Sequence, residues 1–140
     1  MDLSKIINDL LDTLSKRDLN HVIQFYDDAF IFELVPEQVS IKGISAWYKA
    51  IEEFFNWVDE GRKELLRCCQ QNDIIWIERI DHWKINGTWV AIPIMAVVQF
   101  TKEGKVLNWR EYHTLEYRRQ FDSPPETGFS QNTKAPLVDQ

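Results

Sequence analysis

The chain has 140 residues, of which 44% are hydrophobic and 13% aromatic, and its 16 basic and 22 acidic residues give a net charge of −6. This length is typical of a single domain with a hydrophobic core, and an acidic balance without a basic run excludes nucleic acid and anionic membrane surfaces as expected partners. The sequence shows neither a transmembrane span nor a secretory signal, so we expect a cytoplasmic protein.

Hydrophobic periodicity divides the chain into a helical first part and a strand-rich second part. Apolar residues at three- and four-residue steps predict amphipathic helices, and runs of branched and aromatic residues predict strands. Turn signals separate the later strands at Asn72-Asp73, Asn86-Gly87 and Glu103-Gly104. The predicted helices cover residues 3–14, 19–26 and 45–58, and the predicted strands cover residues 30–35, 65–70, 74–85, 88–101 and 105–117.

This order of elements predicts an α+β fold. We expect three N-terminal helices packed on a strongly curved, mixed or antiparallel sheet. A sheet that wraps around helices leaves a hole at its centre, where a ligand fits. The domain is expected to span residues 1–121. Prolines, glycine and polar residues without apolar periodicity predict an irregular tail over residues 122–140.

The apolar segment 90–98 predicts a homodimer. Its apolar residues occupy both faces of a strand, so one face is expected to pack on helix and the other on a second subunit, through the sheet. Pro93 lies in the middle of this strand. Because proline cannot donate a ladder hydrogen bond, it predicts a bulge or a sheet edge there.

The cysteines and histidines predict neither a disulfide nor a metal site. Cys68 and Cys69 are adjacent, and neighbours on a strand point to opposite faces, so a bridge between them would be strained. We expect both thiols to be reduced. The three histidines are scattered without metal-ligand spacing. The sequence therefore predicts no metal and no cofactor.

Ionisable residues interrupt the apolar strand 74–83. Side chains alternate along a strand, so Arg79 and Asp81 share one face with Ile77 and Trp83. Being two residues apart, the charged groups can meet in a place that the apolar neighbours shelter from water. A buried charge pair is costly unless something uses it, so the pair is a candidate functional site.

A second group of candidates lies on the strand 105–117. Its alternation places Glu111 on one face with Trp109 and His113. If this face meets that of Arg79, two carboxylates bracket one guanidinium, an arrangement suited to acid and base chemistry. The residues alone favour the alternative that these charges form surface ion pairs on a half-exposed sheet.

Two motifs and the order of elements resemble a known family. Glu78-Arg79-Ile80-Asp81 and Trp109-Arg110-Glu111-Tyr112 resemble the limonene-1,2-epoxide hydrolase branch of the NTF2-like superfamily, also termed SnoaL-like or cystatin-like. In that family an Arg-x-Asp and the Asp of a Trp-Arg-Asp-Tyr stretch form an Asp-Arg-Asp site. The resemblance implies an α+β cone and a cofactor-free hydrolase that adds water directly to the epoxide of a lipophilic small molecule.

The resemblance also implies a role for each residue of the site. Asp81 would be the protonated general acid, Glu111 the general base, and Arg79 the bridge between them. The tryptophans could instead simply fill the core. The predicted substrate-binding residues are Glu33, Ile77, Trp83, Trp109 and His113.

The chain departs from the family's pattern in two ways. Glu111 is one methylene longer than the family's Asp, in chemistry that is sensitive to a misplacement of about 1 Å. The family also holds its water with a Tyr and an Asn two residues apart, and residues 30–36 contain no such pair. Glu33 is the candidate for the Asn-like place. Tyr26, Tyr48 and His113 are alternative donors.

Three functions are therefore open at the level of the sequence. The first is an epoxide hydrolase, the second a non-catalytic binding protein that holds an apolar ligand, and the third an acid-base enzyme similar to ketosteroid isomerases or polyketide cyclases. Arg79 between two acids favours the first over the third. The missing Tyr and Asn favour the second over the first.

Overall fold

The computed structural model describes residues 1–113. The expected end of the last strand near residue 117, the domain boundary at 121 and the tail 122–140 lie outside the described residues. The elements are α1 (Leu3–Ser15), α2 (Leu19–Val22), the 3₁₀ helix η1 (Ile23–Phe25), β1 (Tyr26–Leu34), β2 (Val39–Lys42), α3 (Ile44–Trp57), β3 (Glu60–Gln71), β4 (Ile74–Ile85), β5 (Thr88–Phe100) and β6 (Val106–Tyr112).

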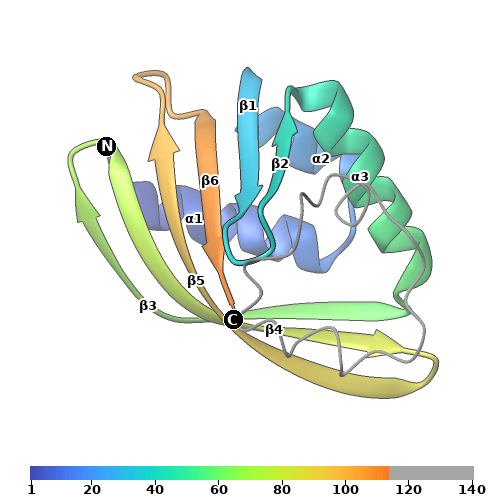
Figure 1. Cartoon of the computed structure of the whole chain (residues 1–140). Helices are drawn as coiled ribbons and strands as arrows, with labels where there is room; N and C mark the ends of the chain where they lie inside the picture. Colours follow the sequence, from blue (N-terminus) through green and yellow to red (C-terminus); the bar gives the residue numbers. More distant parts are fainter. Residues whose placement is uncertain (114–140) are drawn as a thin grey trace, which may run out of the picture.

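The strands form one mixed sheet in the order β2-β1-β6-β5-β4-β3. Neighbouring strands are antiparallel except β1 and β6, which are parallel. The long strands are strongly bent, and α1 packs on β3 while α3 packs on β1 and β2 (Figure 1). The predicted α+β class, with three α-helices on a curved sheet, is confirmed for the described residues. Within this part of the chain no helix has the length and apolar character needed to cross a membrane.

Helix α1 presents one apolar face to the sheet. Asp2 caps it by accepting hydrogen bonds from two backbone N–H groups of the first turn, which have no partner within the helix. At its other end, the hydroxyl of Ser15 donates to the carbonyl of Leu11 and accepts from the backbone N–H of Lys63 at 3.0 Å. This bond fixes the helix to β3 beside the site described below.

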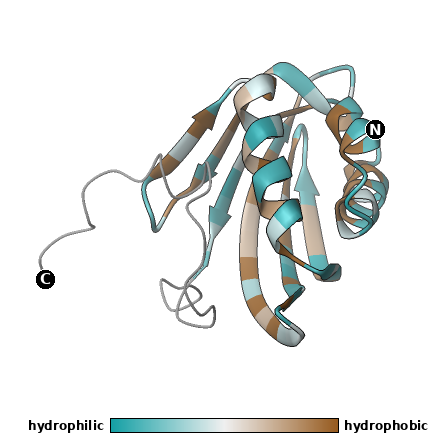
Figure 2. Ribbon diagram, turned by 90° about the vertical axis from the view of Figure 1, so that its right-hand side faces the viewer, coloured by the Kyte–Doolittle hydropathy of each residue, from teal (hydrophilic) through white to brown (hydrophobic). Residues whose placement is uncertain are grey.

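Helix α3 covers the other end of the sheet. Gly43 begins it with a φ of +90°, a conformation that residues with a Cβ rarely adopt. In Figure 2 the face of α3 turned toward the viewer is mostly hydrophilic, and the sheet lies behind it. Its buried residues are Trp47, Ala50, Ile51 and Phe55. These side chains close the space between the helix and the sheet.

Strand β4 shows the predicted two-residue alternation along its whole length. Its inner residues are buried, whereas the residues between them are only partly buried. The inner set is Ile75, Ile77, Arg79, Asp81, Trp83 and Ile85. The sheet therefore places a guanidinium and a carboxylate within an otherwise apolar core.

Gly61 on β3 lies opposite Trp83 on β4. A Cβ at position 61 would lie 2.1 Å from the indole ring, so only glycine leaves room for the ring over the backbone. The same indole packs edge-on against Phe54 of α3, with ring centroids 4.9 Å apart. Trp83 thus ties the strand to the helix, two residues from Asp81.

One prediction in the first half of the chain was wrong, and one strand was missed. The expected helix 19–26 ends at Val22, and Tyr26 begins β1 because it pairs with Val106 of β6; this tertiary pairing outweighs the local helical pattern. Strand β2 was not predicted. It is short and has turns before it, and it pairs with β1 through Phe32 and Ile41 among others.

Of the two alternatives expected at Pro93, a bulge or a sheet edge, the bulge was wrong. The register between β5 and β4 is continuous, with Pro93 opposite Ile80. On the other side of β5, the pairs formed by the described residues of β6 begin at Met95. Pro93 thus lies where β5 has no ladder partner on that side within residues 1–113, which is compatible with its missing N–H.

Candidate active site

A cavity of about 100 Å³ lies between the helices and the inner face of the sheet. Because one water needs only about 10–15 Å³, it has room for several waters or a compact organic group. Its wall is largely apolar and aromatic, with Tyr26, Phe32, Leu34, Trp47, Trp83 and Trp109 among its residues. The charged residues that line it are Lys63, Arg79, Asp81 and Glu111.

Arg79 and Asp81 form a forked ion pair on the inner face of β4. Nε of Arg79 donates to Oδ1 of Asp81 at 2.8 Å, and Nη2 donates to Oδ2 at 3.3 Å. The two residues are 2% and 4% exposed, so solvent does not screen the pair. The face that the sequence predicted for them is confirmed.

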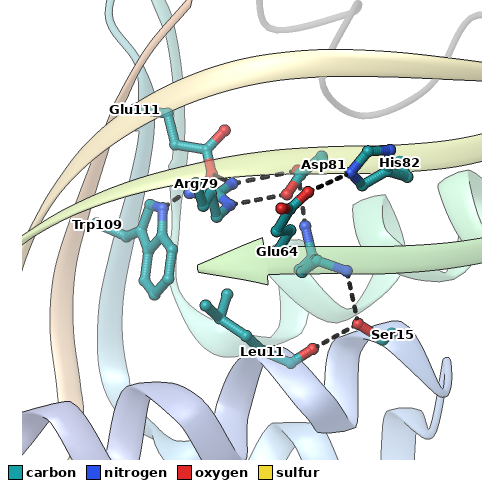
Figure 3. Close-up of polar contacts among 9 residues, drawn as sticks. Leu11, Ser15, Glu64, Arg79, Asp81, His82, Trp109 and Glu111 are labelled. Atoms are coloured by element: carbon teal, nitrogen blue, oxygen red, sulfur yellow. Dashed lines mark hydrogen bonds and ion pairs between the residues drawn. The ribbon is translucent and has the colours of Figure 1, made fainter. Parts of the chain in front are cut away.

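Glu111 completes the predicted trio from β6 (Figure 3). The same Nη2 of Arg79 donates to Oε1 of Glu111, and the indole Nε1 of Trp109 donates to that oxygen at 3.0 Å. Between the strands, Ala96 of β5 lies opposite both Ile77 and Glu111, and its small side chain leaves space for the guanidinium to reach across β5. The predicted meeting of the two faces is therefore observed.

Two polar atoms of the trio have no hydrogen-bond partner within the described residues. Oε2 of Glu111 makes no hydrogen bond to any described residue, whereas Oε1 accepts two. Nη1 of Arg79 is buried and has no hydrogen-bond partner within residues 1–113. A buried donor without a partner is unusual, and both atoms belong to residues that line the cavity. Of the two, Oε2 of Glu111 is not among the fully buried atoms, so it is the one that a ligand can reach.

Lys63 of β3 is a fourth charged residue, which the sequence did not reveal. It lies opposite Asp81 in the strand register, and its Nζ donates to Oδ2 of Asp81 at 2.7 Å. Its side chain is only 7% exposed, and Nζ lies 4.9 Å from the centroid of a Trp83 ring. The cluster thus combines two cations with two carboxylates.

These contacts set the protonation state of Asp81. Burial alone would raise the pKa of its carboxyl, but the charges of Arg79 and Lys63, and their hydrogen bonds, outweigh burial and lower the pKa to about 2. Asp81 is therefore ionised at neutral pH. The two cationic donors therefore favour the ionised form of Asp81, whereas the family resemblance implies a protonated one.

The two cations respond to the same surroundings in opposite ways. Burial lowers the pKa of Lys63 and the nearby Arg79 lowers it further, although Asp81 and Glu111 raise it, and the pKa ends below its ordinary value. For Arg79, burial lowers the pKa, but the two carboxylates outweigh burial and raise it. Arg79 is thus a permanent cation, while Lys63 is the cation that can release a proton.

A second buried pair lies at the edge of the cavity. Nε2 of His113, which lines the cavity, lies 3.0 Å from Oε1 of Glu37, and the two side chains are 3% and 6% exposed. The position of His113 at the cavity agrees with the sequence prediction. Glu37 was not predicted, because it lies in the loop after β1, where no strand pattern assigns its side chain a direction.

The remaining predicted substrate-binding residues divide between cavity, core and outer surface. Trp83 and Trp109 line the cavity as expected. Ile77 is fully buried but is not part of the cavity wall. The placement expected for Glu33 is corrected: it points to the outer face and pairs with Arg110, because the inner positions of β1 belong to its buried neighbours.

Tyr26 supplies a phenol to the cavity. It is buried beneath Trp47, and burial raises the pKa of its hydroxyl, with a further increase from the charge of Glu111. The phenol is therefore a neutral hydrogen-bonding group within the field of Glu111. Among the alternatives raised by the sequence, it is the tyrosine that lines the cavity.

Across the described residues, no group of three or more side chains is arranged to hold a metal ion.

Neither a protein-family model nor a curated protein matches the chain. Solved structures do match. A protein described as a SnoaL-like polyketide cyclase, from Shewanella putrefaciens CN-32, has a TM-score of 0.77 at 15% identity, with 86% of this chain and 95% of that chain covered. An LEH-like epoxide hydrolase from M. tuberculosis has a TM-score of 0.73 at 17% identity, with 91% and 89% covered.

A third solved structure is an epoxide hydrolase/cyclase-like enzyme of pyran ring formation in the polyether salinomycin. Its TM-score is 0.71 at 16% identity, and the match covers 81% of this chain and 91% of that chain. At such identities the likenesses show the fold alone. The chain has the NTF2-like, SnoaL-like fold, which epoxide hydrolases and cyclases share with proteins of unknown function.

Proposed function

We propose that the protein is a cofactor-free hydrolase that opens the epoxide of a lipophilic small molecule with water. The observation that carries the proposal is Arg79 held between two buried carboxylates, Asp81 and Glu111, in the wall of one apolar cavity. An LEH-like epoxide hydrolase is among the structures that share the fold, which supports the same reaction class.

Glu111 is the proposed general base. Arg79 and Trp109 hold its Oε1, which leaves Oε2 free to accept a hydrogen bond from a water. As that water attacks an epoxide carbon, its proton passes to Oε2 while the carbon–oxygen bond of the ring breaks. General-base assistance of this kind is worth about 10²- to 10⁴-fold in rate.

The opposite end of the cluster is the proposed site for the epoxide oxygen. Negative charge develops on that oxygen as the ring opens, and cations held in a dry cavity stabilise such charge strongly. Asp81 is the carboxylate that positions Arg79 and Lys63 for this task, because it bonds both.

The cavity wall favours a lipophilic substrate. Aromatic rings and branched side chains from α3, β1, β4 and β5 make up most of it, so binding removes apolar surface from water. Such a wall also keeps bulk water from the cluster. This suits attack by one positioned water.

The test is diol formation on a panel of lipophilic epoxides. Wild type is expected to release diol, and Glu111→Gln is expected to lose about 10²- to 10⁴-fold in kcat because Gln cannot accept the proton. Glu33→Gln is the matched control: Glu33 bonds an arginine on the outer face, so its replacement should leave turnover unchanged.

Two results would contradict the proposal. If the Glu111→Gln variant keeps wild-type turnover, Glu111 is not the general base. No turnover on any epoxide, combined with tight binding of an apolar ligand, would instead support a non-catalytic binding protein of this fold.

A second candidate reaction uses an internal hydroxyl of the substrate in place of water. The observation that favours it is the apolar surface beside the base: Phe32 and Leu34 of β1 lie opposite Trp109 and Glu111 in the register. Glu111 would then deprotonate the substrate's own hydroxyl, and the ring opening would form a cyclic ether.

Product analysis distinguishes the two reactions. A hydroxy-epoxide incubated in ¹⁸O-water would give a labelled triol if water attacks, and an unlabelled cyclic ether if the internal hydroxyl attacks. A labelled product from every substrate would exclude the cyclase candidate. Exclusive formation of cyclic ether would exclude the hydrolase.

We also propose that the protein is a homodimer through the outer face of the sheet. Met95 and Tyr112 form a cross-strand pair there and are 44% and 40% exposed, and the partly buried Trp76 lies opposite Val97 on the same face. An apolar patch across central strands is typical of an interface. Light scattering of wild type and of Met95→Glu tests this, with a dimer expected only for wild type.

A further inference from the structure

Lys63 is the buried cation that neither sequence motif contains. It lies in the cavity wall, and its Nζ is held 2.7 Å from Asp81. Its backbone is fixed as well, because the N–H of Lys63 donates to Ser15 of α1. A lysine fixed in this way is built into the site and is not a mobile surface residue.

Asp81 is held as a carboxylate by hydrogen bonds from two cations. Its Oδ1 accepts from Nε of Arg79, and its Oδ2 accepts from both Nη2 of Arg79 and Nζ of Lys63. These charge-assisted bonds favour the ionised carboxylate, which has no proton to donate. The ring-opening reaction needs a proton at this end of the site, so another group must supply it.

We propose that Lys63 is the proton donor of the site, with its ammonium protonating the oxygen that is released when the epoxide opens. This inference rests on the proposed function, because ring opening is the step that needs the proton. Asp81 is then a positioning residue that stays ionised and directs Nζ into the cavity.

The surroundings of Lys63 suit a group that releases its proton. Burial and the charge of Arg79 favour the neutral amine, and Asp81 and Glu111 favour the ammonium. The cavity residues of α1 and α3 are uncharged, and the other titratable groups that line the cavity are Tyr26 and His113. Arg79 cannot replace Lys63 as donor, because a guanidinium keeps its proton in proteins.

The protons of the step balance between Glu111, which accepts one, and Lys63, which donates one. The water oxygen bonds to the epoxide carbon, the ring carbon–oxygen bond breaks, and the electron pair moves to the ring oxygen. Glu111 takes one proton from the water, and Lys63 gives one to the ring oxygen. The product is a neutral diol. A proton then returns from the Glu111 carboxyl to the Lys63 amine through solvent as the diol leaves.

The kinetic test compares Lys63→Arg and Lys63→Met with wild type. Both variants are expected to lose about 10²- to 10⁴-fold in kcat with little change in KM, since Arg keeps the charge but cannot release its proton. Wild-type kcat is expected to fall as pH rises and Lys63 loses its proton. This limb should be absent from both variants. Lys84→Arg, a half-buried lysine paired with Glu60, is the control.

A second measurement does not depend on turnover. In protein labelled with ¹³C-lysine, the Cε signal that Lys63→Arg removes is expected to titrate at lower pH than the other lysine signals. Co-titration with the others, or a Lys63→Arg variant with wild-type kcat and the same pH limb, would overturn the assignment. A wild type inactive on every epoxide would overturn the proposed reaction, and the titration would still decide whether Lys63 holds a labile proton.

Discussion

The two faces of β4 carry similar ionisable residues in opposite surroundings. On the inner face, Arg79 and Asp81 are 2% and 4% exposed and bond other buried groups. On the outer face, Glu78 pairs with Arg67 of β3, and these two side chains are 35% and 80% exposed. Both pairs join an arginine to a carboxylate. Their burial differs most.

The strand register therefore decides how much an ion pair contributes to stability, because it decides whether the pair is buried. An exposed pair gains only about 0–1 kcal/mol, because water solvates both partners well. A buried charge that loses its partner costs about 3–5 kcal/mol. A shift of one residue in β4 would exchange the two faces.

Replacing Arg79 is expected to have the largest effect. Arg79→Met leaves Asp81 and Glu111 as buried carboxylates without their shared cation, and we expect a loss of about 3–5 kcal/mol in the free energy of unfolding. The outer-face control, Arg67→Met, should lose less than about 1 kcal/mol. Urea unfolding of both variants measures the contrast. Equal losses would mean that burial does not distinguish the two faces.

Acid should remove part of the stability through Asp81. Its pKa is about 2 in the fold, against an ordinary value of 3.8, so the unfolded chain takes up the proton first as the pH falls. The contribution is therefore present above about pH 4 and lost as the pH falls toward 2. At about 1.4 kcal/mol per pKa unit it amounts to roughly 2 kcal/mol.

The acid prediction is measured by unfolding at a series of pH values. Asp81→Asn is expected to flatten the fall in stability below pH 4, because it removes the titrating group. Asp28→Asn, on an exposed residue of β1, is the control and should keep the wild-type fall. An unchanged fall in Asp81→Asn would show that Asp81 is not held ionised.

A methyl group at Gly61 should disturb the inner face beside the cluster. Gly61→Ala places a carbon 2.1 Å from the indole of Trp83, and such overpacking costs about 1–3 kcal/mol. The combination with Trp83→Leu removes the clash, so the added cost of the methyl should largely disappear in a double-mutant cycle. A full cost that persists in the combination would place the strain elsewhere.

The smallest effect is expected at another outer-face pair of β4. Nε2 of His82 lies 2.9 Å from Glu64 of β3, with side chains that are 21% and 41% exposed. Glu64→Gln should change the free energy of unfolding by less than about 1 kcal/mol, because solvent screens the pair. A loss as large as that of Arg79→Met would contradict the comparison between faces.

The face of each residue in the trio could be predicted from local information, whereas the meeting of the two faces was implied only by the family resemblance, because the residues alone favoured surface ion pairs. The two-residue period of β4 puts Arg79 and Asp81 on one face, and the period of β6 does the same for Glu111 and Trp109. The same rule applies to Glu33, which alternates with the inner Phe32 and Leu34. Its expected place in the cavity followed the family pattern against this alternation, and the alternation was right.

Lys63 could not be found in the same way. The segment 60–64 is charged and has no apolar period, so the predicted strand began only at residue 65. Its pairing with β4, which places Lys63 opposite Asp81, exists only in the folded sheet. Strand β2 was missed because it has only four residues and becomes a strand by pairing with β1.

The most direct test of the central claim, that the buried charges act as one catalytic unit, is a double-mutant cycle in kcat/KM. The variants are Asp81→Asn, Glu111→Gln and their combination, measured on the best epoxide. Because Arg79 joins both carboxylates, the combination is expected to lose little more than the worse single variant. Losses that multiply would contradict the claim, since they would show two carboxylates acting independently.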